Sequence, residues 1–139
     1  MLNYTNVITE ERSFSGLQMK EIKPVMKLII RGKKREFLSA VGKSLNLLLP
    51  SEANTSSRSE NLTAIWLSPD EWMIYSNVTI DSKNNDYETE NLLNKSISKK
   101  NLGAVTDVTD QFVMINFITG LISFICKPEK DLSSVITFV

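Results

Sequence analysis

Histidine is absent from this chain of 139 residues, and cysteine occurs once, at Cys126. Without histidine the chain lacks the side chain that most often acts as a general base near neutral pH and most often binds metals. A single cysteine forms no internal disulfide and builds no thiolate metal site. Because free cysteine packs as a small hydrophobic group, we predict a buried and inert Cys126.

The chain also lacks net charge, long apolar runs and a basic leader. Sixteen Lys and Arg balance sixteen Asp and Glu, whereas a nucleic-acid-binding protein normally carries a basic excess. No segment approaches the roughly 18–20 continuous apolar residues of a membrane span, and residues 1–12 lack the basic and apolar regions of a signal peptide. We therefore expect a cytoplasmic protein that binds neither nucleic acid nor membranes.

Catalytic motifs are missing as well: there is no phosphate-binding loop, no Gly-x-Gly-x-x-Gly, no Gly-x-Ser-x-Gly and no cluster of metal ligands. Asp107 and Asp110, three residues apart, permit an interpretation as paired carboxylates, and so does Asp70-Glu71. Short acidic side chains beside turns more often accept hydrogen bonds from backbone amides. We therefore predict capping roles for these carboxylates, and an interaction or scaffold domain rather than an enzyme.

Hydrophobic periodicity predicts an α+β fold with a mostly antiparallel sheet and two main helices. The helices are expected over 33–46 and 87–99, where apolar residues recur at helical spacing. Gly42, inside the first helix, suggests close packing onto a neighbour. The predicted strands are an edge strand over 17–22, a strand over 25–31, a hairpin over 62–75, and a second hairpin that pairs 105–108 with 112–118 across a turn at 109–111.

The ends of the chain and its longest loop show the weakest pattern. Residues 1–16 are polar and aperiodic, which predicts a flexible N-terminal arm before a single α+β domain over 17–139. Residues 51–61 are predicted as a polar loop. The apolar residues 135–139 must be covered by the protein's own fold, as in a last strand, or by another chain.

Two local features have both a structural and a functional interpretation. Trp66 and Trp72 flank a Ser-Pro-Asp turn, and aromatic residues in a hairpin are more often core than a stacking surface for a planar cofactor. Lys33, Lys34 and Arg35 open the first helix with the charge that its dipole disfavours. These three residues form either a solvated face or a contact with an acidic surface on a partner.

Two segments, in the order and at about the separation seen in a known family, carry a resemblance. Residues 64–72 (Ala-Ile-Trp-Leu-Ser-Pro-Asp-Glu-Trp) resemble that family's tryptophan–leucine–glycine–proline–aspartate–glutamate–tryptophan signature, with serine in place of glycine. Residues 104–111 (Ala-Val-Thr-Asp-Val-Thr-Asp-Gln) are similar to its valine–threonine–aspartate–valine–serine–aspartate segment. Over residues 25–118 the chain thus resembles the gamma subunit of heterotetrameric sarcosine oxidase. The match also runs through residues 28–32, 40–42, 49–50 and 54–55. The motif residues are Arg31, Gly32, Pro50, Trp66, Pro69, Asp70, Glu71, Trp72, Thr106, Asp107 and Asp110.

The resemblance implies a fold like the N-terminal folate-binding-type domain of the glycine-cleavage T-protein superfamily, abbreviated at its C-terminus because residues 119–139 diverge from the family. It implies an assembly role beside alpha, beta and delta subunits that oxidatively demethylate sarcosine, with no catalytic, cofactor-binding or metal-binding residues in this chain. FAD, FMN, NAD and tetrahydrofolate are implied for those partner subunits. The alternative is a free-standing protein of the same superfamily that binds tetrahydrofolate or transfers one-carbon units.

Overall fold

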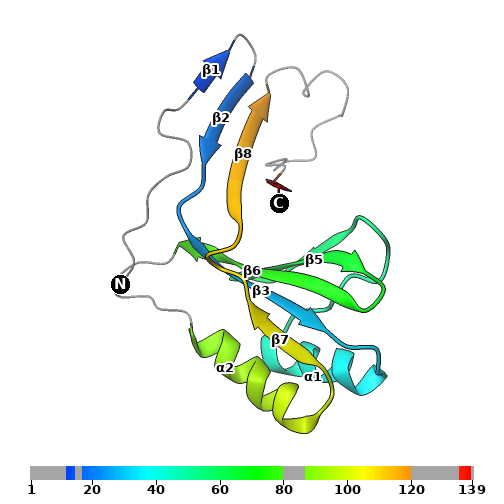
Figure 1. Cartoon of the computed structure of the whole chain (residues 1–139). Helices are drawn as coiled ribbons and strands as arrows, with labels where there is room; N and C mark the ends of the chain where they lie inside the picture. The colour runs from blue at the N-terminus through cyan, green and yellow to red at the C-terminus, as the bar shows by residue number, and fades with distance from the viewer. Residues whose placement is uncertain (1–11, 15–16, 80–86, 120–134, 139) are drawn as a thin grey trace. The chain divides into compact units, whose positions relative to one another are not determined.

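The computed structural model describes residues 12–14, 17–79, 87–119 and 135–138 (Figure 1). Two compact units make up the chain. The larger unit, Val25–Thr109, is continuous in sequence, whereas the smaller one combines the segments Met1–Pro24 and Asp110–Val139. The single domain over 17–139 stays a prediction.

The larger unit is a five-stranded sheet in the order β4-β5-β6-β3-β7 with two helices packed on it (Figure 1). All its strand pairings are antiparallel, which confirms the predicted α+β class and sheet type. The strands are β3 (Val25–Arg31), β4 (Ser56–Arg58), β5 (Leu62–Ser68), β6 (Glu71–Thr79) and β7 (Ala104–Asp107). The helices are α1 (Arg35–Leu45), α2 (Tyr87–Ser96) and the short 3₁₀ helix η1 (Ser98–Lys100).

The core of this unit lies between one face of the sheet and the two helices. Alternate residues of β3, β5 and β6 share that face because successive side chains of a strand point to opposite sides. Phe37 and Val41 of α1 and Leu93 of α2 cover it, and each is 0% exposed. Burying a large apolar side chain contributes about 1.5–3 kcal/mol, so this contact stabilises the unit. The sheet residues of the core are Met26, Leu28, Ile30, Leu62, Ala64, Trp72 and Ile74.

The predicted hairpin over 62–75 is confirmed as β5 and β6. Its turn consists of Pro69 and Asp70, between the paired residues Ser68 and Glu71. Proline presets the φ angle that the second position of such a turn requires. The register shifts between Trp66 and Ser68, and an irregularity of this kind increases the local twist of the ladder.

Both predicted helices are present, with shorter bounds. α1 begins at Arg35 because Lys34 still has an extended backbone (φ −82°, ψ 149°), and it ends where Asn46 adopts a left-handed conformation (φ 49°, ψ 41°). α2 ends at Ser96, and the chain continues as η1 until Asn101 turns left-handed (φ 53°). Asparagine populates this region more readily than most residues do. The two asparagines therefore end these helical segments.

Gly42 lies inside α1 and is half-buried. A methyl group at this position would meet the carbonyl oxygen of Leu47 at 3.8 Å, which is an ordinary van der Waals distance. The prediction that Gly42 marks a close helix contact is therefore wrong.

The smaller unit is a four-stranded antiparallel sheet in the order β1-β2-β8-β9. The apolar residues Val135–Phe138 form its last strand, which is one of the two alternatives that the sequence leaves open. The segment 17–22 forms a strand as predicted, but not at an edge, because β2 pairs with β1 on one side and β8 on the other. The strands are β1 (Arg12–Phe14), β2 (Leu17–Glu21), β8 (Val113–Thr119) and β9 (Val135–Phe138).

Two strands occur where the sequence predicts none. β1 lies within the predicted N-terminal arm and pairs with β2, whereas β4 lies within the predicted loop 51–61 and pairs with β5. Both are three-residue edge strands. Such short segments are too brief to show an apolar period, so periodicity does not detect them. Cys126 and residues 1–11 and 15–16 lie outside the described residues.

The predicted second hairpin is wrong. β7 pairs with β3 and β8 pairs with β2, so the two segments expected to pair with each other belong to different sheets. The Val108 N–H donates to the Lys27 carbonyl oxygen at 2.9 Å, and the Lys27 N–H donates to the Thr109 hydroxyl at 3.0 Å. These bonds extend the association with β3 beyond the end of β7. The turn over 109–111 is present, as predicted.

Candidate functional site

Five motif and patch residues meet where β3 leads into α1 beside the β5–β6 turn. The Gly32 N–H donates to the Asp70 carbonyl oxygen at 2.9 Å. Arg31 Nη2 lies 3.0 Å from Glu71 Oε1, and Lys33 Nζ lies 3.6 Å from Asp70 Oδ2. The side chains of Arg31 and Lys33 are 61% and 82% exposed, so each ion pair contributes only about 0–1 kcal/mol. We call this set the signature corner: Arg31, Gly32, Lys33, Asp70 and Glu71.

The carboxylate of Asp70 is held in its charged form within the turn. The Ser68 hydroxyl donates to Asp70 Oδ1 at 3.0 Å, and this hydrogen bond is the main reason why the pKa of Asp70 lies below its ordinary value. Burial acts in the opposite direction, whereas the charges of Lys33 and Arg31 lower the pKa further. Asp70 therefore has a structural role in the turn, although the donor is a hydroxyl rather than the predicted backbone amide.

The two tryptophans belong to the core, which confirms the structural interpretation. Trp72 is 4% exposed, and its indole N–H donates to the Pro50 carbonyl oxygen at 2.8 Å. Its ring stacks on that of Phe37, with centroids 5.8 Å apart and planes at 28°. Trp66 is half-buried and packs against the same core. Trp72 is therefore a core residue, and Trp66 lies at the margin of the same core.

Two glycines allow the backbone to approach Phe37 closely. A Cβ atom at Gly32 would overlap the Phe37 ring. A Cβ atom at Gly103, in the connection between η1 and β7, would overlap both that ring and the carbonyl oxygen of Arg31. Packing against the Phe37 ring therefore requires glycine at the motif position Gly32. It requires glycine at Gly103 as well, in a segment about 70 residues later in the chain.

The second motif lies on β7 and in the turn that follows it. The Thr109 N–H donates to Asp107 Oδ1 at 2.9 Å, which confirms the capping interpretation for Asp107. Thr106 is exposed and lies opposite Ile29 of β3. Asp110 is exposed and begins the C-terminal segment of the smaller unit. None of these three residues belongs to the signature corner.

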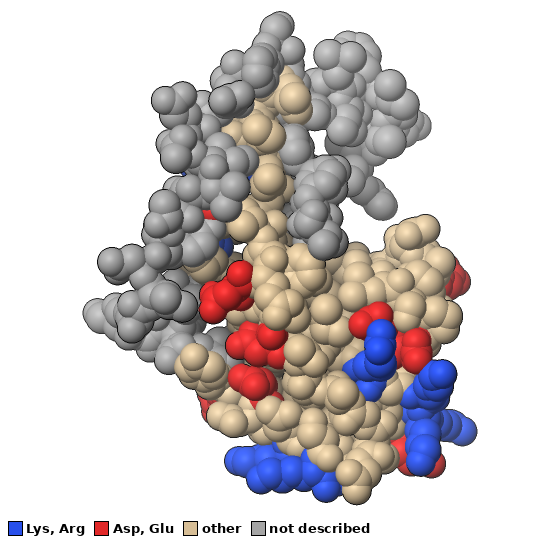
Figure 2. All heavy atoms as spheres, viewed as in Figure 1, with Lys and Arg blue, Asp and Glu red and all other residues tan. Residues whose placement is uncertain are grey.

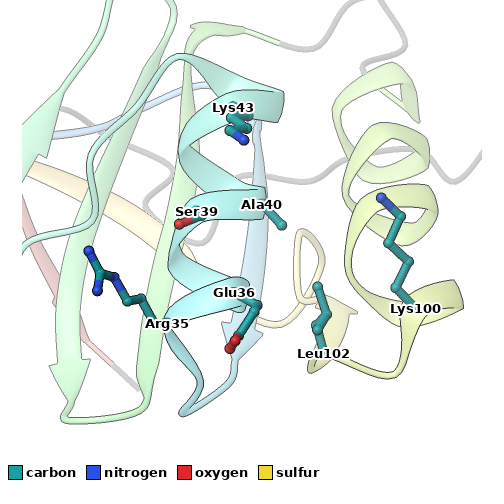
Figure 3. Close-up of a pocket in the computed structure, with 7 residues that line it drawn as sticks. All are labelled: Arg35, Glu36, Ser39, Ala40, Lys43, Lys100 and Leu102. Atoms are coloured by element: carbon teal, nitrogen blue, oxygen red, sulfur yellow. The ribbon is translucent and has the colours of Figure 1, made fainter.

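A groove of about 400 Å³ lies between α1 and the segment that contains η1 (Figure 3). Ala40 and Leu102 project into the space between these two elements (Figure 3). Of the predicted contact patch, Lys33 joins the signature corner, Lys34 is exposed, and only Arg35 lines this groove. We call the groove between α1 and the η1 segment the basic groove. Its remaining lining residues are Glu36, Ser39, Lys43 and Lys100.

Sequence reasoning missed the basic groove because its residues come from segments about 60 positions apart. It also missed Lys27, which is 3% exposed. The ammonium group of Lys27 donates to the carbonyl oxygens of Val25, at 3.1 Å, and Thr109, at 2.9 Å. A lysine in the middle of an otherwise apolar strand was the signal that could have found it, since buried charges are normally paired or hydrogen-bonded.

Within the part of the chain that the structure describes, no three side chains of His, Cys, Asp or Glu come together as metal ligands. In the same residues, no helix is long and apolar enough to cross a membrane.

Comparison with known proteins gives a likeness in fold without one in sequence. No protein-family model and no curated protein sequence matches the chain. Among solved structures, a chain of heterotetrameric sarcosine oxidase from Corynebacterium sp. U-96, in complex with pyrrole 2-carboxylate, superimposes with a TM-score of 0.65 at 14% identity. The match covers 88% of this chain and 61% of that one. The likeness therefore extends beyond residues 25–118, which carry the sequence resemblance, and the chain spans about three-fifths of the length of its structural neighbour.

Proposed function

We propose that this chain is a non-catalytic subunit of a hetero-oligomeric complex related to heterotetrameric sarcosine oxidase, in the position of the gamma subunit. The observation that carries the proposal is the likeness in fold to a chain of such a complex over 88% of this chain. The motif resemblance, which rests on the sequence and not on the fold, supports the same assignment. A relation to the N-terminal domain of the T-protein superfamily is part of this proposal.

The contacts of the motif residues support an assembly role. Ser68 and Asp70 bond to each other, Arg31 pairs with Glu71, and Trp72 donates to a backbone carbonyl. Side chains that are engaged within the fold hold its shape, whereas catalytic groups must reach a substrate. The proposed partners are the alpha, beta and delta subunits, and FAD, FMN, NAD and tetrahydrofolate are proposed to bind to those partners.

Co-expression tests the proposal. The tagged chain is produced together with sarcosine oxidase alpha, beta and delta subunits encoded by the same source, and captured through its tag. We expect the three subunits to be retained in fixed ratio, with flavin absorbance in the captured complex. A chain that elutes as a monomer beside an intact flavin-containing complex would contradict the proposal.

Titration of the isolated chain with tetrahydrofolate separates the proposal from the free-standing alternative. The subunit proposal predicts no saturable heat of binding in calorimetry, because it places tetrahydrofolate on the partner subunits. Saturable binding in the micromolar range would favour the tetrahydrofolate-binding alternative.

A further inference from the structure

The larger unit carries a strong excess of positive charge on one part of its surface, although the whole chain is neutral. Residues 31–46 and 95–100, which contain α1 and η1, hold eight of the chain's 16 Lys and Arg and a single acidic residue, Glu36. Figure 2 shows basic side chains gathered along the lower edge of this unit, over its helices. Only Arg31 and Lys33 of these cations lie in the ion pairs of the signature corner.

The cations of the basic groove are spread out rather than gathered round one point. Arg35 and Lys43 lie at opposite ends of α1, eight residues or about 12 Å apart at the rise of an α-helix. Lys100 lies across the groove from them, and the guanidinium group of Arg35 extends away from it (Figure 3). An extended chain lying in the groove would pass Lys43 and Lys100, whereas the guanidinium group of Arg35 lies on the other side of α1 (Figure 3).

The apolar part of the groove favours a peptide over a polyphosphate. Ala40 and the half-buried Leu102 project between the two elements, where a partner's aliphatic side chain would find contact. A nucleic-acid backbone has no such group to place there, and the carboxylate of Glu36 would repel it. A peptide can instead place a donor against Glu36 and its acidic side chains against Lys43 and Lys100.

We propose that the basic groove binds an extended acidic segment of a partner protein, with acidic side chains against Lys43 and Lys100 and one aliphatic side chain on Ala40 and Leu102. This inference shares one requirement with the proposed function, which is that the chain has a partner protein. It does not depend on which complex that partner belongs to. Binding is electrostatic at an exposed surface, so it weakens as the salt concentration rises.

Fluorescence anisotropy with the full chain tests this inference. The probe is a labelled peptide in which one leucine is flanked by two Asp and two Glu, and the control probe replaces the acids by Asn and Gln. The double variant Lys43→Glu/Lys100→Glu is expected to weaken binding of the acidic peptide by about tenfold or more. Arg58→Glu makes the same kind of charge reversal at an exposed position on β4, outside the groove, and is expected to leave binding unchanged.

The outcomes separate this inference from the proposed function. Equal affinity of the wild-type chain and the double variant for the acidic peptide would overturn the inference, and so would tighter binding of a single-stranded oligonucleotide of equal charge. The milder variant Lys43→Gln/Lys100→Gln removes the two charges without reversing them. If charge and not misfolding causes the weaker binding, this variant should lose less affinity for the acidic peptide than the double Glu variant does. If the peptide binds in the groove but the chain does not co-purify with flavin-bearing subunits, the proposed function fails and this inference stands.

Discussion

Gly32 leaves no room for a side chain because the ring of Phe37 occupies the place of a Cβ atom. We predict that Gly32→Ala lowers the free energy of unfolding by about 1–3 kcal/mol, as overpacking of a core does. Gly42→Ala is the matched control, since the added methyl group meets an ordinary contact inside α1. It should raise stability by about 0.5–1 kcal/mol through helix propensity. Urea titration followed by circular dichroism measures both, and equal changes would contradict the packing argument.

Trp72 stabilises the core through its hydrogen bond as well as its bulk. Trp72→Phe keeps the aromatic ring on Phe37 but leaves the buried carbonyl oxygen of Pro50 without this donor. We expect a loss of about 1–3 kcal/mol, the cost of an unsatisfied buried polar group. Trp66→Phe removes the same atoms from a half-buried position, so it should lower the free energy of unfolding by less than Trp72→Phe does. Thermal unfolding of the two variants, compared with wild type, checks the order.

Asp70 makes the stability of the chain sensitive to acid. Its pKa is lowered in the folded chain from an ordinary value of 3.8. Such a carboxyl stabilises the fold above its unfolded-state pKa, and that contribution is lost as the pH falls through the folded-state pKa. We therefore predict that the free energy of unfolding decreases as the pH is lowered below about 4. In Asp70→Asn this decrease should be smaller. Urea midpoints over an acidic pH series measure the effect, with Glu60→Gln as the exposed control; identical profiles for Asp70→Asn and wild type would rule the role out.

At the scale of elements, asparagines decide where the helical segments stop. Asn46 and Asn101 both have positive φ angles, of 49° and 53°. A β-branched residue is strained in this region, whereas glycine enters it freely. We predict that Asn46→Val lowers the free energy of unfolding by about 1–2 kcal/mol and that Asn46→Gly changes it little or raises it. Chemical denaturation of the two variants checks this, and an equal cost for valine and glycine would exclude the conformational explanation.

The strand order shows which elements could be predicted and which could not. The β5–β6 hairpin was predictable because its apolar runs and its proline turn are adjacent in sequence. The pairing of β7 with β3 was not predictable, because 77 positions separate Ile29 from its partner Thr106 and no local signal marks the pair. The same applies to β4, whose three polar residues join the sheet through backbone bonds alone.

At the scale of the whole molecule, membership of a complex has a thermodynamic consequence. A partner that binds only the folded chain stabilises it by about 2.7 kcal/mol when its free concentration is 100 times the dissociation constant. We therefore predict that the chain unfolds at a higher temperature in the captured complex than alone, and that this temperature rises with partner concentration. Differential scanning calorimetry of the free and the assembled chain measures the shift, and its absence would contradict a stable subunit.

The sequence by itself determined the fold class, both helices, the central hairpin and the core position of Trp66 and Trp72. These features depend on neighbours within a few residues, where periodicity and turn chemistry operate. Only the tertiary structure decided that β7 and β8 join different sheets, that Gly32 and Gly103 meet Phe37, and that Arg35, Lys43 and Lys100 line one groove. These contacts join residues far apart in the chain, and their positions follow from packing rather than from any local pattern.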